Sequence, residues 1–242
     1  MSDFDFSIIF NSRSRVPMLR KMLESVASKT KGIEKVEVIV NFDDDDQESL
    51  PVLHPLKNDF PFLKCLVNPR ELNIHTNVNK MAFMSKGRYI WPLGDDCHIM
   101  TQDWDYIAKD KFEKANELFN DGIFLGAVES TSVDKCLSYG WYCDAPMLTR
   151  KGLNALGYLI HPHFISVGAD VATWVVYASV NRIIDMREIM FDHVTHNSLE
   201  ACNKKDQTQI EYLQRQMSNQ VFNPFTYDYS KYIEEIKKVV YE

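Results

Sequence analysis

Two adjacent carboxylates, Asp95 and Asp96, are the residues of this sequence best placed to bind a cation. They follow an apolar run, residues 89–93, that predicts a buried strand, and Gly94 frees the backbone where this strand ends. Ligands of open α/β sheets bind beyond the carboxyl ends of the strands, so both carboxylates are expected at the mouth of a crevice. Carboxylate oxygens suit Mg²⁺ or Mn²⁺, and such a cation also binds a diphosphate. The alternative interpretation is a solvated Asp–Asp turn.

A second group of carboxylates follows another predicted strand. Residues 36–42 form a nearly continuous apolar run, which is typical of a parallel strand covered on both faces, and Asp43 and Asp44 come directly after it. If this strand shares a sheet with the first, both acidic groups face one crevice. Asp43 or Asp44 could then accept hydrogen bonds from a nucleobase imide or from ribose hydroxyls. The same run is otherwise a solvated acidic turn, which is the interpretation we favour for Asp45 and Asp46.

The histidines of the second half differ in what they could do. His193 follows a short predicted strand, and its imidazole could complete a Mn²⁺ site beside a carboxylate. The alternative is a histidine that is hydrogen-bonded within a loop. His161 and His163 flank a proline in a loop, and we expect them at the surface or in an acceptor cleft rather than on a metal.

The elements that position these residues alternate between strand and helix in the first half of the chain. Strands are predicted at 6–10, 36–42, 62–67, 89–93 and 123–128, and helices at 17–26, 79–85 and 104–119. The second half is less regular: a helix at 148–156, one starting at 170, two short strands within 182–194, and C-terminal helices starting at 206 and 231. The alternation predicts an α/β fold, with a mostly parallel central sheet and helices on both faces.

Composition excludes several classes of protein. The 242 residues are 45% hydrophobic and 25% charged, as in an ordinary globular protein, and no linker argues for more than one domain. The net charge of −7 disfavours binding to a nucleic-acid backbone. Neither a GxGxxG nor a P-loop phosphate motif is present.

The cysteines and the N-terminal segment predict a cytoplasmic protein. Five cysteines, an odd and scattered set without a CxxC pair, indicate reduced thiols rather than disulfides or a zinc site. Residues 1–6 are acidic and lack the apolar stretch of a signal peptide. The longest apolar segment, residues 171–180, is too short to span a bilayer, so no transmembrane segment is expected.

Three blocks of this sequence resemble the family 2 glycosyltransferases of the GT-A fold. They are 7–13 (SIIFNSR), 38–44 (VIVNFDD), and 82–90 (AFMSKGRYI) followed by Gly94-Asp95-Asp96. The resemblance covers roughly residues 5 to 200. It implies a Rossmann-like, three-layer α/β/α domain spanning 1–242, with a nucleotide-binding half (about 1–130) and a less regular acceptor-side half with C-terminal helices (about 131–242).

The resemblance also implies roles for individual residues. The residues implied to bind the nucleotide-sugar are Asn11, Arg13, Asp43, Asp44, Arg70, Asn79 and Asp95. Of these, Asn11 and Arg13 would lie against the nucleobase, Arg70 and Asn79 along the nucleotide and diphosphate, and Asp95 at the ribose or the metal. Asp96 would be the direct metal ligand, and His193 matches the family's histidine position better than His196 does. Gly94 departs from the common DxD pattern, which removes one carboxylate from this loop.

The acceptor side of the family has a counterpart in the second half. Three segments carry this resemblance, 146–150, 156–158 and 168–170. They make Asp170 the candidate general base, which takes the proton of the acceptor hydroxyl as its oxygen attacks. A helix N-cap is the other interpretation of Asp170, and both can hold together. Trp141, with Tyr139 and Tyr142, could form an aromatic platform for a sugar or a hydrophobic acceptor, although core packing explains each equally well.

These residues together predict a metal-dependent, inverting glycosyltransferase. Its donor would be a nucleotide-diphosphate sugar, its cofactor Mn²⁺ or Mg²⁺, and its acceptor a glycan, a lipid-linked molecule or a protein. A nucleotidyltransferase of similar fold is disfavoured because residues 11–15 lack the glycines of its phosphate loop. A catalytically silent sugar- or protein-binding module is the remaining alternative, and Gly94 is the feature in its favour.

Overall fold

The computed structural model describes residues 3–71, 73–131, 143–162, 168–194 and 228–241. An eight-stranded sheet runs through it, with the strand order β3-β2-β1-β4-β7-β6-β8-β5. The strands are β1 Phe6–Ser12, β2 Val36–Asp43, β3 Leu63–Asn68, β4 Tyr89–Pro92, β5 Cys97–Ile99, β6 Leu125–Ser130, β7 Met147–Thr149 and β8 Ile183–His193. Strands β5 and β7 are antiparallel to their neighbours, and the other strands all run in one direction. The predicted mostly parallel sheet is therefore confirmed.

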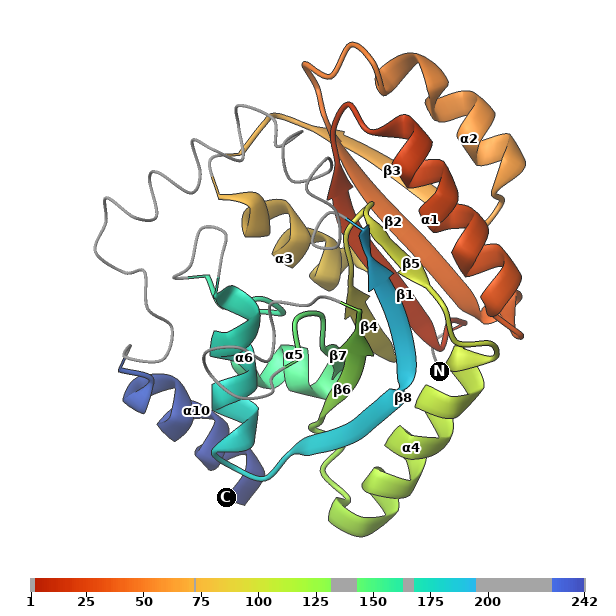
Figure 1. Ribbon diagram of the computed structural model, residues 1–242. Helices are drawn as coiled ribbons and strands as arrows, with labels where there is room; N and C mark the ends of the chain where they lie inside the picture. Colours follow the sequence, from red (N-terminus) through yellow and green to blue (C-terminus); the bar gives the residue numbers. More distant parts are fainter. Residues whose placement is uncertain (1–2, 72, 132–142, 163–167, 195–227, 242) are drawn as a thin grey trace.

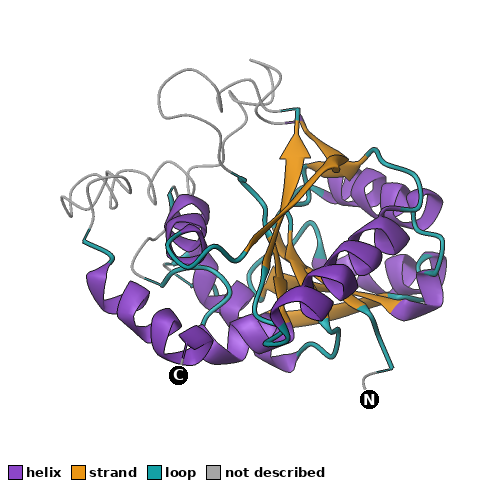
Figure 2. Cartoon of the chain, turned by 90° about the horizontal axis from the view of Figure 1, so that it is seen from below, coloured by secondary structure: helices purple, strands orange, loops and turns teal. Residues whose placement is uncertain are grey.

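Helices cover both faces of this sheet (Figures 1 and 2). On one side lie α1 Val16–Lys29, α2 Leu53–Asp59 and α4 Trp104–Phe119, and on the other α3 Ile74–Met84, α5 Arg150–Leu156 and α6 Ala169–Ala178. Helix α10, Ser230–Tyr241, packs against α5 and α6. Two short 3₁₀ helices, Ile33–Lys35 and Leu50–Val52, precede β2 and α2. The arrangement is the predicted three-layer α/β/α fold.

In the first half of the chain, the apolar residues of each strand and helix are the ones that the fold buries. The first five side chains of β1 are buried, because α-helices cover that strand on both faces. Helix α1 begins with a proline in its first turn, and it buries the spaced set Leu19, Met22, Leu23 and Val26. Trp91 of β4 and Trp104 of α4 are fully buried, with ring centroids 4.9 Å apart. These contacts fix the central strands against the helix layer.

Two helices begin at other residues than the sequence predicts, because of hydrogen bonds near their N-termini. The helix expected at 79–85 is α3, and it starts earlier because the Asn73 side chain caps it by accepting from the backbone N–H of His75. The helix expected at 148–156 starts only at Arg150. Its first predicted residues form β7, which pairs with β4 and β6, and Thr149 then caps α5.

The C-terminal half holds the other differences. The two short strands expected within 182–194 form one long strand, β8, whose pairing with β6 is interrupted by an irregularity in register. Strand β5 and helix α2 were not predicted, because both are short and carry no clear apolar periodicity. Helix α10 corresponds to the helix expected from Lys231. The helix expected from Asp206 lies outside the described residues.

The register of the strands brings the polar segments to one edge of the sheet. Strand β1 pairs in parallel with β2 on one side and with β4 on the other. The loop after β1 therefore lies between the ends of β2 and β4, where Asp43 and Asp95 stand. Strand β5 pairs antiparallel with β8, and Cys97 is the register partner of His193. This last pairing sets the end of β8 beside Asp96.

The described cysteines are not joined by disulfides. Cys65, Cys97 and Cys143 form no disulfide among the described residues, and Cys136 and Cys202 lie outside those residues. Within the described ranges, no helix combines the length and the apolarity that crossing a bilayer requires.

Candidate functional site

The turn after β1 is fixed by a buried carboxylate. Ser14 has the left-handed φ of 52°, which a non-glycine residue adopts only when its surroundings hold it there. Asp46 holds it by accepting bonds from the Ser14 backbone N–H (2.9 Å) and hydroxyl (3.0 Å). Asp46 is fully buried and also accepts from the backbone N–H groups of Glu48 and Ser49. The expectation that Asp46 is solvated was wrong, because the backbone of this turn needs its oxygens.

Arg13 points from this turn toward the end of β2. Its Nη1 lies 3.1 Å from Asp43 Oδ2, and its guanidinium also contacts the exposed Asp45. Burial raises the pKa of Asp43, and the charge of Arg13 partly offsets this effect. Asp44 and Arg70 are both exposed beside this pair. The structure thus gathers Arg13, Asp43 and Asp44 at one strand end, with the charge of Arg70 also lowering the pKa of Asp43.

Two asparagines of the predicted nucleotide site are engaged with backbone groups. Asn11 Nδ2 donates to the Ile74 carbonyl at 2.7 Å, and this bond ties the end of β1 to α3. Asn79 donates from Nδ2 to the Ile160 carbonyl (2.9 Å) and accepts from the N–H groups of Leu159 and Ile160. Asn79 therefore holds the segment after α5 against α3.

Asp95 is buried beneath the β1 turn. Ser12 Oγ donates to its Oδ2 at 2.8 Å, and Arg15 Nη1 lies 3.3 Å from its Oδ1. Burial raises the pKa of Asp95 to about 7, with Arg15 lowering it and the neighbouring charge of Asp96 raising it further.

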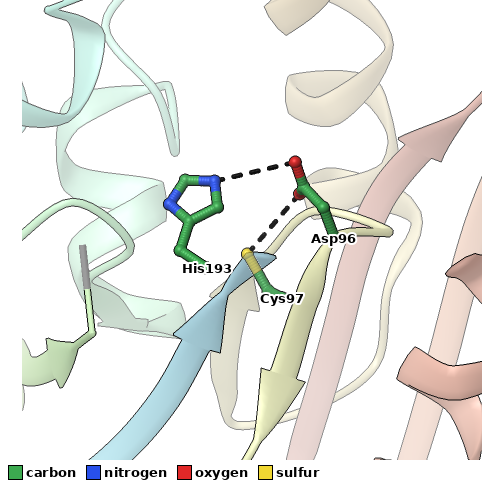
Figure 3. A group of neighbouring side chains, drawn as sticks. All are labelled: Asp96, Cys97 and His193. Carbon is green, nitrogen blue, oxygen red and sulfur yellow. Dashed lines mark hydrogen bonds and ion pairs between the residues drawn. The ribbon is translucent and has the colours of Figure 1, made fainter. Parts of the chain in front are cut away.

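Asp96 faces His193 across the ends of β4 and β8 (Figure 3). Its Oδ2 lies 3.7 Å from His193 Nε2, and its Oδ1 accepts from the Cys97 thiol at 3.8 Å. A Cβ built at Gly94 would collide with Asp96 Oδ1. The glycine that departs from the DxD pattern therefore has a physical reason: it leaves room for the Asp96 carboxylate to fold over it.

The other face of His193 meets a carboxylate that the sequence had not indicated. His193 Nδ1 lies 3.7 Å from Asp144 Oδ2, and Ser130 Oγ donates to that same oxygen at 2.7 Å. Burial lowers the pKa of His193, but Asp144, Asp96 and Asp170 together raise it above its ordinary value. Metal-binding histidines are commonly oriented in this way by a carboxylate on the second ring nitrogen.

Asp170 lies near enough for its charge to act on His193, and it is not the helix N-cap. Gly168 occupies the cap position of α6, and Asp170 sits in the first turn. Its Oδ1 accepts from the Val171 N–H at 2.9 Å. The N-cap interpretation was wrong, because the cap position lies two residues earlier, at the left-handed Gly168.

Three other predictions concern the acceptor side. Trp141, Tyr139 and Tyr142 lie outside the described residues, as does His163. His161 was expected at the surface or in a cleft, but it is fully buried. Its ring packs against three tyrosines at the junction with α10: Tyr158, Tyr229 and Tyr232. The sequence could not predict the burial of His161 at this junction, because the junction joins segments far apart in the chain.

The residues that the sequence missed are Arg15, Cys97 and Asp144. Arg15 was read as part of a polar loop, and only the turn at Ser14 directs its side chain to the carboxylates. Cys97 follows Asp96 directly, but a lone cysteine carries no ligand pattern. Asp144 had no signal at all, since its partner His193 is distant in sequence.

The donor set fits a small divalent cation. The ligand atoms of Asp96, Cys97 and His193 all lie within 4.8 Å of one another. Two ligands of one such cation, each about 2.1 Å from it, lie roughly 3 to 4 Å apart, and the 3.7 Å between Asp96 Oδ2 and His193 Nε2 is within that range. Burial and the Asp96 charge raise the pKa of the Cys97 thiol well above its usual value. A raised pKa disfavours the thiolate as a ligand, and Asp96 and His193 supply one carboxylate and one imidazole, a set suited to Mn²⁺.

Comparisons with solved structures give the same fold. S. aureus TarS 1–349 in complex with UDP-GlcNAc matches with a TM-score of 0.60 at 14% identity, covering 98% of this chain and 82% of that one. The mannosyltransferase PcManGT from Pyrobaculum calidifontis, in complex with GDP-Man and Mn²⁺, matches at 0.60 and 11% identity, covering 97% and 69%. GalNAc-T7 with UDP, GalNAc and Mn²⁺ matches at 0.62 and 11% identity, covering 98% and 54%. The chain spans 43% of the longer TarS structure.

The sequence comparison is more specific than the structural one. No curated protein matches this chain. The sequence model described as glycosyl transferase family 2 matches residues 7–151, which include the β1 turn, the end of β2 and both aspartates after β4. That match covers more than half of the chain, and the sheet and helices described above have the arrangement of the solved glycosyltransferases. This chain belongs to glycosyl transferase family 2.

Proposed function

We propose that this protein is a metal-dependent, inverting glycosyltransferase that moves a sugar from a nucleotide-diphosphate sugar to an acceptor hydroxyl. The observation that carries the proposal is the approach of Asp96 Oδ2 to His193 Nε2, 3.7 Å apart, at the edge where β1, β2 and β4 end. These two side chains come from segments almost a hundred residues apart. A carboxylate and an imidazole facing one another there suit a cation that neutralises a diphosphate.

Asp96 and His193 would hold Mn²⁺ or Mg²⁺. When bound, the cation supplies Lewis-acid stabilisation of the departing diphosphate. Asp144, with Ser130 on its Oδ2, orients the imidazole. Because one carboxylate and one imidazole are only two protein ligands, the cation would keep coordination positions for water and for phosphate oxygens.

The other residues divide between donor and acceptor. Arg13 and Asp43 form an ion pair at the end of β2 that offers both a donor and an acceptor to a nucleobase. Asp95 would bind a ribose hydroxyl or the metal. Asp170 would take the proton of the acceptor hydroxyl on a carboxylate oxygen. It lies close enough to His193 for its charge to raise the pKa of that imidazole.

The donor and acceptor are proposed only as classes. The similar structures hold UDP, UDP-GlcNAc or GDP-Man, which supports a nucleoside-diphosphate sugar without selecting the nucleotide. The acceptor is a hydroxyl of a glycan, a lipid-linked molecule or a protein. We further propose that residues 1–242 act as one catalytic domain located in the cytoplasm.

The first experiment identifies the donor. The protein is heated with UDP-, GDP-, dTDP- and CMP-sugars, each with and without Mn²⁺, and a selective ligand is expected to raise Tm by mass action. Donor cleavage is then followed as release of the nucleotide. Stabilisation by one nucleotide class only with Mn²⁺, followed by turnover, supports the proposal. Binding without turnover of any nucleotide sugar would instead support a silent sugar-binding module.

Two substitutions then assign the roles. Asp96→Ala is expected to abolish Mn²⁺-dependent donor binding in calorimetry, because the carboxylate ligand is gone. Asp170→Asn is expected to keep donor binding and to lose transfer by about 100-fold or more, because only proton abstraction is removed. Asp110→Asn, an exposed aspartate of α4, is the matched control. Unchanged metal-dependent affinity in Asp96→Ala, or retained turnover in Asp170→Asn, would refute the respective assignment.

A further inference from the structure

Arg15 lies over the two carboxylates of the metal site, and nothing in the proposed function uses it. Its Nη1 is 3.3 Å from Asp95 Oδ1 and 3.6 Å from Asp96 Oδ2. We propose that Arg15 is an internal counter-cation: it pairs with Asp95 and Asp96 when no metal is bound, and it pairs with the diphosphate when metal and donor bind. This inference rests on the proposed function and adds to it an order of binding.

Arg15 and the proposed cation would share one oxygen of Asp96. Asp96 Oδ2 is the atom that faces His193 Nε2 at 3.7 Å, and it is also the atom that faces the guanidinium of Arg15 at 3.6 Å. A cation bound to Asp96 Oδ2 and His193 would therefore meet a positive charge already placed on the same oxygen. The two positive groups compete for Asp96, and metal binding must displace or repel Arg15.

The fold fixes this position of Arg15. The left-handed Ser14 lies between the two arginines of the turn, and the buried Asp46 holds that conformation. Arg13 is thereby directed to Asp43 and Arg15 to the opposite strand end. The side chain of Arg15 keeps 31% of its surface exposed, so it can turn toward a ligand without unpacking a core.

The charges that face Arg15 give the functional consequence. Arg15 offsets part of the negative charge of Asp95 and Asp96, and a divalent cation on Asp96 would add two positive charges beside it. Together these positive charges favour a diphosphate, whose oxygens match the planar fork of a guanidinium. Metal alone should bind weakly, and metal and diphosphate should each strengthen the binding of the other, as linkage requires.

The test uses three variants and two probes. Mn²⁺ alone is titrated into the protein and free Mn²⁺ is followed by electron paramagnetic resonance. Inorganic pyrophosphate is titrated by calorimetry at saturating Mn²⁺, which needs no knowledge of the sugar or nucleotide. Arg15→Met removes the charge, Arg15→Lys keeps the charge but loses the fork, and Arg20→Met is the control, because Arg20 pairs with the surface residue Asp59. Circular dichroism confirms that each variant is folded.

The two affinities are expected to move in opposite directions. Arg15→Met should bind Mn²⁺ alone about tenfold more tightly, because a repelling charge is gone, and should bind pyrophosphate about tenfold more weakly, because a charge-assisted bond is lost. Arg15→Lys should keep the wild-type affinity for Mn²⁺ and lose part of the affinity for pyrophosphate. Arg20→Met should match the wild type in both.

The outcomes separate this inference from the proposed function. If the wild type binds Mn²⁺ through Asp96 and Arg15→Met has the same Mn²⁺ affinity, or both affinities fall together, the counter-cation role is overturned while the metal site stands. If the wild type does not bind Mn²⁺ and Arg15→Met does, the competition is supported and metal dependence of the native enzyme is not. If neither protein binds Mn²⁺, both proposals fail.

Discussion

Replacing Asp46 with alanine tests how the β1 turn is held. Asp46 was interpreted from the sequence as a solvated residue of an acidic run, but its side chain is fully buried. It accepts four hydrogen bonds: from the Ser14 N–H and hydroxyl, and from the backbone N–H groups of Glu48 and Ser49. Alanine removes all four bonds and leaves the Ser49 N–H buried without this acceptor.

The size of the effect follows from which donors water can reach. Ser14 is exposed, so water can replace Asp46 at its N–H and hydroxyl, whereas Ser49 is buried and must bear the desolvation penalty. One uncompensated buried donor costs about 1–3 kcal/mol, and the loss of the constraint on Ser14 adds to it. We expect a loss of about 2–3 kcal/mol in the free energy of unfolding. For a chain of this length that lowers Tm by roughly 5–10 °C.

The assay is thermal and urea unfolding of Asp46→Ala beside Asp45→Ala. Asp45 is the adjacent carboxylate, but it is exposed, so its variant should keep the wild-type Tm. Burial tends to raise the pKa of Asp46, but its bonds to Ser49 and Ser14 lower it below the ordinary value. The stabilisation is therefore present above the unfolded pKa and lost as pH falls, so Asp46→Ala and wild type should converge in acid. Equal Tm values at neutral pH for the two variants would refute the reasoning.

Two further predictions concern His193 and the core of the sheet. Asp144→Asn should lower the pKa of His193 in an NMR titration and weaken Mn²⁺ binding by about tenfold, because the imidazole loses the carboxylate that orients it. Asp185→Asn, which changes an exposed residue of β8, is the control. An unchanged pKa of His193 in Asp144→Asn would contradict the assignment. Burial tends to raise the pKa of Glu37, but hydrogen bonds from Lys64, from Ser7 and from the backbone N–H of Lys86 lower it below its ordinary value. The stability that the ionised Glu37 contributes to the fold is therefore present above its unfolded pKa and lost as pH falls. Glu37→Gln should therefore cost about 1–2 kcal/mol in urea unfolding at neutral pH and less near pH 4, and a difference that grows in acid would contradict this account.

The fold was largely predictable because its first half obeys simple patterns. Apolar runs such as residues 36–42, and the helical spacing from Leu19 to Val26, each report burial directly, so strands and helices followed. Short elements escaped, since β5 and β7 are three residues each and exist only through their pairing with other strands. The position of Asp95 and Asp96 after β4 was predictable for the same reason as the strand itself.

The sequence by itself determined the strands and helices of the first half, the aspartates that follow β2 and β4, and the family, because these depend on residues close together in the chain. Tertiary structure alone decided which partners those aspartates have. Asp96 meets His193 only because β5 pairs with β8, and Arg15 reaches Asp96 only because Asp46 holds the Ser14 turn. Contacts between distant segments depend on strand register and on backbone hydrogen bonds, and a local pattern of residue types carries neither.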